Sequence, residues 1–129
     1  MIVVFVDTNV IMYAVGREHA LRPDAQQFFL DALEAGEVLV SSAEVLQELL
    51  HAYLPVGRME TLDAALTLAQ SRLADVWPVE EDDVRLARAF VERQPGLGAR
   101  DLLHLACCRR RGVERIKSFD RALSSAAAG

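Results

Sequence analysis

A run of five apolar residues opens the chain and stops abruptly at polar ones. Residues 2–6 read Ile-Val-Val-Phe-Val and are followed by Asp7, Thr8 and Asn9. A short apolar run rich in β-branched residues is typical of a central parallel strand that is covered on both faces. In open α/β sheets, ligands bind at the carboxyl ends of such strands. The pattern therefore predicts a buried strand that delivers Asp7 to a functional edge.

The remaining apolar positions predict helices that alternate with short strands. Pro23 suits a first helical turn and Gly36 a helix end, and most later segments repeat apolar residues at helical spacing. We expect helices over residues 10–15, 23–35, 41–54, 59–73, 80–91, 101–112 and 120–127, and strands over residues 2–6, 38–40, 76–77 and 116–118. Alternation of this kind indicates an α/β fold with a parallel sheet.

Two of these helices carry more detailed expectations. Residues 41–44 read Ser-Ser-Ala-Glu, and the Ser-x-x-Glu form of a capping box predicts that a helix starts at Ser41. In the helix over residues 80–91, spacing predicts a buried face that consists of Val84, Ala87, Phe90 and Val91.

The length of 129 residues suffices for one domain with a real core, so a single domain over residues 1–129 is expected. No apolar run approaches the ~18 residues that span a bilayer, and no basic leader precedes the first strand. The protein is therefore expected to be soluble and cytoplasmic. Cys107 and Cys108 are adjacent, which disfavours both a structural disulfide and a metal site, and we expect both to be reduced within a helix.

Charge is distributed unevenly around the net value of −5. Residues 1–99 contain 7 basic and 16 acidic residues, whereas residues 100–129 contain 7 basic and 3 acidic ones. A basic end on an acidic body would suit a phosphate backbone, although three consecutive arginines equally suit a helix C-terminus. The basic residues of this end are Arg100, Arg109, Arg110, Arg111, Arg115, Lys117 and Arg121.

Four acidic residues stand near the ends of predicted strands or in the helices that follow. Asp7 follows the first strand, Glu48 lies about two turns into the helix after the second, and Asp120 follows the last. Asp101 opens a helix after a glycine-containing loop, where the helix dipole favours an ionised carboxylate. The topology therefore predicts that these four carboxylates converge at one edge of the sheet.

Converging carboxylates point to metal chemistry. Two of them ~4 Å apart repel by about 1 kcal/mol in water and by more when partly buried, so a cluster needs compensation. Mg²⁺ binds oxygen ligands, often one or two carboxylates together with substrate phosphates. It also lowers the pKa of a bound water and neutralises charge on a phosphodiester. One or two such ions would fit four acids.

Each candidate also has an ordinary structural explanation. Asp7 and Asp120 suit turns or helix caps, Asp101 a first helical turn, and Glu48 a solvated helix surface. Asn9, Ser41 and His104 are secondary candidates. Asn9 and Ser41 could position water or a carboxylate at the site, but both also suit helix caps. His104 shares a helix face with Asp101 and could touch the site, but a single histidine is more typical of packing. Two acidic features are assigned elsewhere: Glu44 to the capping box, and the run over residues 80–83 to a helix dipole.

Four short motifs together resemble the PIN domain family, and within it the VapC-type toxins of bacterial and archaeal toxin-antitoxin pairs. Residues 6–10 (Val-Asp-Thr-Asn-Val) resemble the family's first motif, and residues 42–49 are similar to the second, with Glu48 in the acidic position. Residues 100–106 (Arg-Asp-Leu-Leu-His-Leu-Ala) resemble the third, and residues 117–120 (Lys-Ser-Phe-Asp) the fourth. The motifs occur in family order and span nearly the whole chain.

The resemblance implies a three-layer α/β/α fold with a central parallel sheet of four or five strands. It also implies Mg²⁺ or Mn²⁺ at the acidic pocket, with Asp7, Glu48, Asp101 and Asp120 as metal-binding and catalytic residues. Endonucleolytic cleavage of RNA is the implied activity, and a homodimer and a cognate antitoxin are the implied partners. Relatives usually continue to a further strand after the position of Asp120, whereas this sequence ends in Ser-Ser-Ala-Ala-Ala-Gly.

Other readings of the same residues remain. A non-catalytic PIN-like binding module would keep the fold without turnover. A phosphorylation-switch domain would need an aspartate at the end of the third strand, where the sequence reads Val-Trp-Pro-Val, and a haloacid-dehalogenase-type phosphatase would need Asp instead of Asn9.

An apolar surplus predicts association between copies of the chain. More large apolar residues fall in the second to fourth helices than one sheet face can cover. They are Phe28, Phe29, Leu46, Leu50, Tyr53, Leu62 and Leu66.

Overall fold

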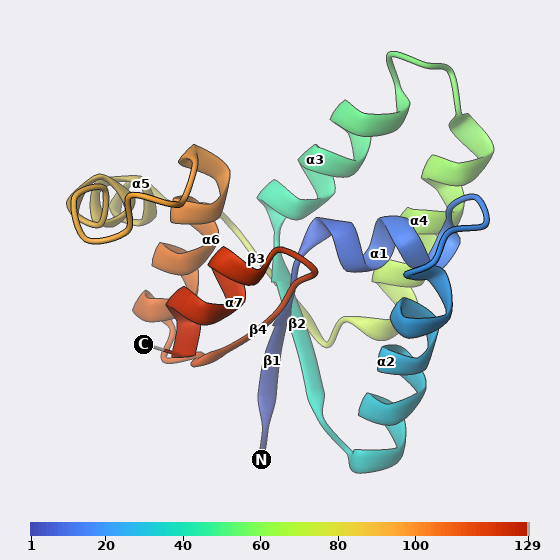
Figure 1. Ribbon diagram of the computed structural model, residues 1–129, viewed down its shortest axis with the longest axis horizontal. Coiled ribbons are helices and arrows are strands. Elements are labelled where there is room, and N and C mark those ends of the chain that lie inside the picture. The colour runs from blue at the N-terminus through green and yellow to red at the C-terminus, as the bar shows by residue number, and fades with distance from the viewer. Residues whose placement is uncertain (129) are drawn as a thin grey trace.

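A computed structural model describes residues 1–128, in which four parallel strands form one sheet between helices (Figure 1). The strands are β1 (Val3–Val6), β2 (Val38–Ser42), β3 (Asp75–Trp77) and β4 (Arg115–Lys117). The helices are α1 (Thr8–Val15), α2 (Arg22–Ala35), α3 (Ala43–Tyr53), α4 (Met59–Arg72), α5 (Glu81–Ala89), α6 (Ala99–Arg110) and α7 (Arg121–Ala128). The predicted alternation is therefore correct, with boundaries that differ by a few residues.

The strand order β3-β2-β1-β4 places the first apolar run at the centre of the sheet. β1 pairs in parallel with β2, where Val4 faces Leu39, and with β4, where Phe5 faces Ile116. Val4, Phe5 and Val6 are buried, as expected for a strand covered on both faces. Since all four strands run in one direction, their carboxyl ends share one edge.

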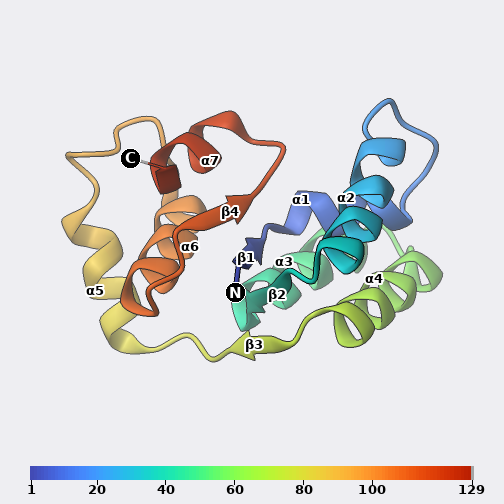
Figure 2. The same ribbon diagram turned by 90° about the horizontal axis from the view of Figure 1, so that it is seen from below.

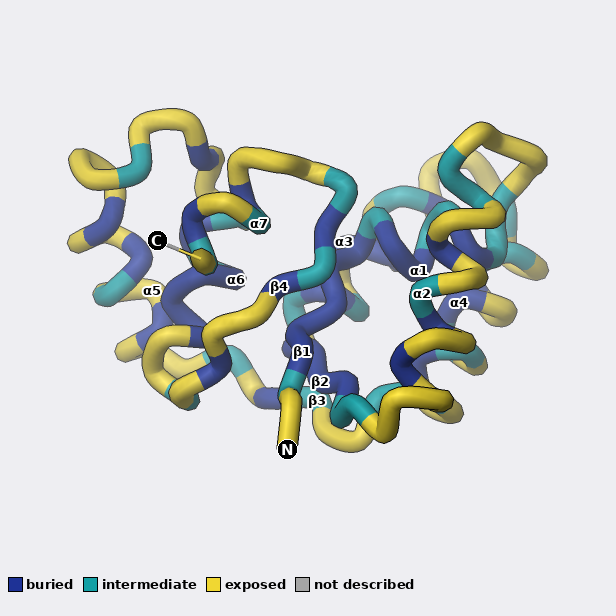
Figure 3. The backbone as a smooth tube through the Cα atoms, turned by 60° about the horizontal axis from the view of Figure 1, so that its bottom comes forward, coloured by how far each residue is buried: buried dark blue, intermediate teal, exposed yellow. Residues whose placement is uncertain are grey.

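Helices cover the sheet on both sides, which gives three layers. α1 packs against α2, α3 and α4, while α5 packs against α6, and α6 against α7. Figure 2 shows these two groups on opposite sides of the strands, and Figure 3 shows the buried strands between exposed outer helix surfaces. The prediction of a parallel α/β/α fold is confirmed, and the sheet has four strands within residues 1–128.

The helix after β2 begins later than the capping-box pattern predicted. Ser41 belongs to β2, and its hydroxyl donates a hydrogen bond to the carbonyl of Val6 over 2.9 Å. Ser42 stands at the N-cap and makes no side-chain capping bond. The expected Ser41–Glu44 box is therefore wrong, because the Ser41 hydroxyl joins β2 to β1 instead.

The buried face of α5 also differs from the prediction. Ala87 and Phe90 are buried as expected, but Val84 and Val91 are 54% and 41% exposed. The buried position is instead Asp83, which is fully inaccessible. It completes a capping box, because the Glu80 backbone N–H donates to its Oδ2 over 2.8 Å.

Two arginines of the basic end neutralise Asp83. Nη1 of Arg110 and Nη1 of Arg111 each lie 2.8 Å from Oδ1 of Asp83. Burial disfavours the Asp83 charge, but these arginine hydrogen bonds and the Glu80 N–H hold its pKa far below the usual range. Glu80 and Asp82 also pair with these arginines, so most of the acidic run over residues 80–83 joins α5 to the end of α6.

The two cysteines lie in α6, where both are buried and free, as predicted. Burial raises the pKa of Cys107 to about 11 and that of Cys108 further, so both thiols are protonated at neutral pH. No helix within residues 1–128 has both the length and the apolar character to cross a membrane.

Candidate functional site

The carboxyl ends of the strands open onto a pocket of about 320 Å³. β1 leads into this pocket through Asp7, Thr8 and Asn9, and the loop after β4 leads into it through Asp120. Helices α1, α3 and α6 supply the rest of the lining, which consists of Met12, Glu48, His51, Ala52, Arg100 and Asp101. All four predicted carboxylates therefore lie in one pocket.

Asp7 is buried directly after β1 and held by two hydrogen bonds. The backbone N–H of Thr8 donates to Oδ1 over 2.7 Å, and the hydroxyl of Ser118 donates to Oδ2 over 2.7 Å. Burial raises the pKa of Asp7 above its ordinary value, although His104 and these two donors oppose the rise. Asp7 stands at the N-cap of α1, so its capping role and its place in the pocket coexist.

Glu48 projects from α3 into the same pocket, where it is 8% exposed. The Thr8 hydroxyl donates to Oε2 of Glu48, and Nε2 of His104 lies 3.2 Å from Oε1. Burial opposes ionisation of Glu48, but the contacts with His104 and Thr8 outweigh it and hold the pKa below the ordinary value. A solvated-surface role for Glu48 is therefore wrong.

His104 is fully buried in α6 and joins the two deep carboxylates. Its Nε2 lies 3.2 Å from Glu48 and 3.6 Å from Asp7, and because both neighbours are acceptors, Nε2 carries the proton. The ring also packs 5.3 Å from Phe5, centroid to centroid. Burial disfavours charge on His104, but Glu48, followed by Asp7 and Asp101, raises its pKa. His104 therefore packs in the core and also contacts the carboxylates of the site.

Asp101 and Asp120 form the outer part of the pocket. Asp101 is half-buried in the first turn of α6, whereas Asp120 is exposed before α7, where its Oδ1 accepts from the Ala122 N–H over 2.9 Å. Burial, together with the Asp7 and Asp120 carboxylates, raises the pKa of Asp101 to about 6. The outer acids thus repel one another, as a carboxylate cluster should.

Asp7, Glu48 and His104 bring possible metal-binding atoms close together. One ligand atom from each lies within 4.8 Å of the others. Asp101 and Asp120 line the pocket without belonging to that group. The inner acids share a histidine proton donor, whereas the outer acids face the pocket mouth.

Asn9, a secondary candidate, connects two segments that line the site. Its Nδ2 donates to the Ser118 hydroxyl over 3.2 Å, and its Oδ1 accepts from the Phe119 N–H over 3.2 Å. Ser41 lies apart from the pocket and contributes only the link between strands described above. Of the secondary candidates, the structure therefore places Asn9 and His104 at the site.

Three further residues belong to the site although sequence reasoning did not select them. Thr8 holds Asp7 and Glu48, Ser118 holds Asp7, and Arg100 is an exposed cation on the pocket wall. Thr8 and Ser118 lie inside the motifs quoted above, so their position beside an acid was the available signal. Arg100 opens the third motif and also belongs to the basic end of the chain, and its position before Asp101 is the corresponding signal.

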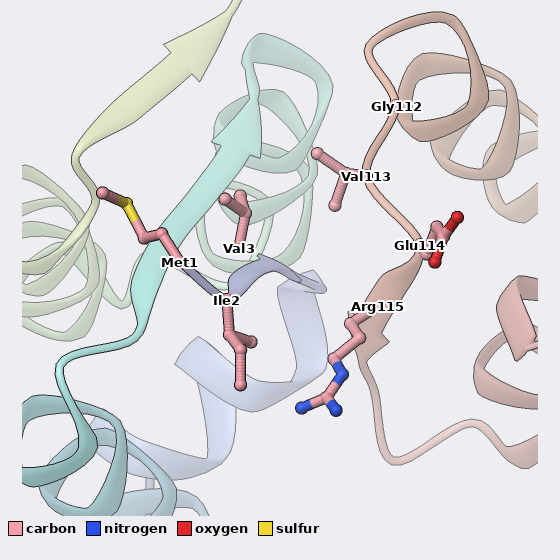
Figure 4. Close-up of a pocket in the computed structure, with 7 residues that line it drawn as sticks. All are labelled: Met1, Ile2, Val3, Gly112, Val113, Glu114 and Arg115. Carbon is pink, nitrogen blue, oxygen red and sulfur yellow. The ribbon is translucent and has the colours of Figure 1, made fainter.

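A second pocket, at the opposite ends of the strands, lacks this chemistry. It has a volume of about 210 Å³ and lies beside the amino ends of β1 and β4. Figure 4 shows its lining, in which Glu114 and Arg115 accompany apolar side chains and Gly112. Its single carboxylate cannot form a cluster, so the acidic pocket is the candidate site.

The family follows from comparison with known proteins. The PIN domain model matches residues 4–129 of this chain. The chain belongs to the PIN domain family. Ribonuclease VapC23 of Mycobacterium tuberculosis is 63% identical over 123 residues, which cover 95% of this chain and 97% of that protein. Ribonuclease VapC13 of the same species is 40% identical over 122 residues, covering 95% and 93%. The resemblance drawn from the four motifs is confirmed, and this PIN domain is of the VapC type.

Solved structures of PIN-domain toxins share the fold. VapC20 of M. tuberculosis, described as a sarcin-ricin loop cleaving toxin, matches with a TM-score of 0.77 at 23% identity, covering 95% of this chain and 94% of that one. VapBC2 of Rickettsia felis, bound to a DNA fragment from its promoter, matches with a TM-score of 0.66 at 21% identity, covering 89% and 85%. At these identities the likeness concerns the fold alone.

Proposed function

We propose that this PIN domain is a metal-dependent endoribonuclease that acts in the cytoplasm as the toxin of a toxin-antitoxin pair. The observation that carries the proposal is the pocket in which Asp7, Glu48, Asp101 and Asp120 meet at the carboxyl ends of parallel strands. The identity to proteins named VapC ribonucleases supports RNA as the substrate. The first line of support is the geometry of the pocket, and the second is sequence similarity to named ribonucleases.

The residues present fit a bound Mg²⁺ or Mn²⁺. Asp7, Glu48, Asp101 and Asp120 would hold it through carboxylate oxygens, the donors that hard cations prefer. Burial raises the pKa values of Asp7 and Asp101, neighbouring carboxylates add to the rise, and a bound cation would favour the ionised form of both. When bound, such an ion lowers the pKa of water and neutralises charge developing on a phosphodiester.

The surrounding side chains hold these carboxylates in place. Thr8 and Ser118 donate to different oxygens of Asp7, and each oxygen keeps a second lone pair for a ligand. The Thr8 hydroxyl and His104 orient Glu48 in the same way. Fixed ligand orientation is the usual contribution of such supporting groups. Arg100 offers a cation at the pocket wall, where a substrate phosphate would approach.

Incubation of the purified protein with a circular single-stranded RNA tests the proposal. A circle has no ends, so its conversion to linear products reports only internal cuts. We expect products with magnesium or manganese and none with excess chelator. Cleavage that persists in excess chelator would contradict metal dependence. Intact circles under every condition, with diverse RNAs, would favour the non-catalytic binding module.

Glu48→Gln should reduce cleavage far more than Glu44→Gln. Glu48 lines the pocket, whereas Glu44 lies one turn earlier on α3 and outside it. The two substitutions remove the same charge from the same helix, so they form a matched pair. Initial rates under identical metal and RNA concentrations provide the measurement, with about a tenfold or greater difference expected for a group that holds or orients a metal. Equal losses would show that Glu48 has no special role.

We propose that the protein forms a homodimer. The structure changes which apolar residues support this proposal. Phe29, Tyr53 and Leu62 of the expected apolar surplus are core residues and so do not contribute to a surface. The exposed apolar side chains on α2 and around the α3–α4 connection are Leu30, Leu33, Leu50, Leu54, Val56 and Met59. These are candidates for burial between copies. Light scattering should give twice the 14.2 kDa of one chain, and a monomer mass at all concentrations would contradict the dimer.

A cognate antitoxin is the second proposed partner, on the strength of the family resemblance. The acidic pocket would accept an arginine side chain, because a guanidinium pairs with carboxylates through two parallel hydrogen bonds. Such a contact would replace the metal charge and inhibit the enzyme.

A further inference from the structure

Three aromatic side chains form a connected series beside the acidic pocket. The ring of Phe119 lies 5.6 Å from that of Tyr13 in an edge-to-face arrangement, and Tyr13 lies 4.6 Å from His19 at an interplanar angle of 32°. Tyr13 and Phe119 are half-buried, and His19 is exposed. The series therefore begins near the core and ends with a ring that faces solvent.

This aromatic series is attached directly to the site. Phe119 precedes Asp120, and its backbone N–H donates to Asn9, which also lines the pocket. Tyr13 follows Met12, another lining residue, and lies one helical turn after Asn9 on α1. In Figure 2 the α1–α2 and β4–α7 loops, which carry His19 and Phe119, both lie in the upper part of the view, toward the β4 edge of the sheet.

The outermost ring is held in a defined orientation. Nδ1 of His19 accepts a hydrogen bond from the Leu21 N–H over 3.0 Å, and one ring face lies against Tyr13. The other end of the series carries positive charge, since Nζ of Lys117 lies 4.9 Å from the Phe119 ring centroid. A series with an oriented, solvent-facing ring at one end and a cation at the other matches the chemistry of single-stranded nucleic acid, which presents bases for stacking and phosphates for pairing.

We infer that Tyr13, His19 and Phe119 form a stacking subsite for a nucleobase of single-stranded RNA adjacent to the cleaved phosphate. The inference rests on the proposed ribonuclease function and extends it to substrate binding. His19 is the ring that contacts the base, Tyr13 supports it, and Phe119 joins both to the segment that carries Asp120. Because the subsite lies outside the carboxylate cluster, it affects RNA binding and leaves the chemical step unchanged.

Substitutions at His19 separate stacking from loop anchoring. Leu keeps similar bulk without a ring, whereas Phe keeps a ring without the Nδ1 acceptor for the Leu21 N–H. A stacking role predicts that His19→Leu raises KM for a single-stranded RNA by about tenfold at nearly constant kcat, and that His19→Phe restores it. Tyr13→Leu and Tyr13→Phe should repeat the pattern. A wild-type KM in both His19 variants would overturn the subsite. An equal rise of KM in both variants, together with a lower melting temperature, would also overturn it, because loss of the loop anchor would then explain the effect.

A binding measurement distinguishes failure of this subsite from failure of the proposed function. Fluorescence anisotropy of a labelled single-stranded oligoribonucleotide of mixed sequence, in excess chelator, reports affinity without cleavage. If wild type cleaves RNA but all variants bind and cleave equally, the subsite is wrong and the ribonuclease stands. If wild type cleaves nothing, the ribonuclease proposal fails. In that case the subsite is still supported if His19→Leu binds the oligoribonucleotide more weakly than wild type and His19→Phe restores the affinity. Equal affinity of all three proteins would overturn it.

Discussion

Asp7→Asn should reduce RNA cleavage at least about a hundredfold while leaving the fold intact. Loss of a group that merely orients a metal ligand commonly lowers activity 10–100-fold, so loss of a ligand at the centre of the cluster should exceed that. The fold should survive because the amide has nearly the same size and its oxygen can still accept from the Thr8 N–H, which keeps the N-cap of α1. Cleavage rates and a thermal melt of the same preparation provide the measurement.

An exposed acid supplies the control for this substitution. Asp63 lies on the surface of α4 and outside the pocket, so Asp63→Asn changes net charge equally without touching the site. It should retain wild-type activity. If Asp7→Asn cleaves RNA within a few-fold of wild type, or if Asp63→Asn loses activity equally, the acidic pocket is not where the reaction occurs.

Asp83→Ala should lower the free energy of unfolding by about 3 kcal/mol, which is roughly 10 °C in melting temperature for a domain of this size. Breaking a buried ion pair by removing one partner leaves uncompensated charge and commonly costs 3–5 kcal/mol. The lower end applies here because Arg110 and Arg111 keep 29% and 18% side-chain exposure and can regain water. Thermal or urea denaturation measures the effect.

Acid should weaken the same contact. The folded-state pKa of Asp83 lies far below its unfolded value, so its contribution is complete above about pH 4 and declines as pH falls further. The stability difference between wild type and Asp83→Ala should therefore narrow in acid. The neighbouring Asp82 is exposed and lies 3.9 Å from Arg110, so Asp82→Ala should melt close to wild type. Equal melting of all three proteins would show that Asp83 does not stabilise the α5–α6 pairing.

The strand that ends at Asp7 was predictable because its apolar residues indicate burial and the acidic residue directly after them indicates a functional site. An apolar run that stops at a carboxylate identifies both the central strand and the residue at its functional end. Glu48 was predictable for a related reason, since helix geometry turns a residue about two turns after β2 toward the same edge. Parallel topology then brings Asp7, Glu48 and Asp120 together without knowledge of side-chain contacts.

Contacts between distant segments were beyond the reach of sequence patterns. The His104 side chain meets Glu48, 56 residues away in the chain, only because α6 packs against the sheet with that face inward. Spacing alone could not separate this arrangement from ordinary packing. In the structure the His104 side chain packs against Phe5 and also contacts both Asp7 and Glu48.

Buried polar residues explain the other differences. Apolar periodicity assigned Val84 and Val91 to the buried face of α5, but Asp83 is buried in their place because arginines 27 and 28 residues later neutralise it. Ser41 extends β2 because its hydroxyl has a partner in Val6. In both cases a distant partner makes burial of a polar group favourable, and a pattern that treats polar residues as exposed misses it.

The central claim is that the four carboxylates form a divalent-cation site, and the metal-free protein should therefore carry their repulsion. Removal of one charge by Asp101→Asn should stabilise it by about 1 kcal/mol, roughly 3–5 °C, at a pH well above 6. The gain should shrink in acid, because the folded-state pKa of about 6 lets wild-type Asp101 take up a proton that relieves the same repulsion.

Thermal melts of wild type and Asp101→Asn, in chelator and across a manganese titration, test this claim most directly. Manganese should raise the melting temperature of wild type by mass action and that of the variant less, because the variant has fewer ligands. The account predicts that Asp101→Asn melts higher in chelator and that wild type overtakes it as manganese increases. A variant that melts lower than wild type in chelator, with both proteins responding equally to manganese, would contradict the account and assign Asp101 to the start of α6 alone.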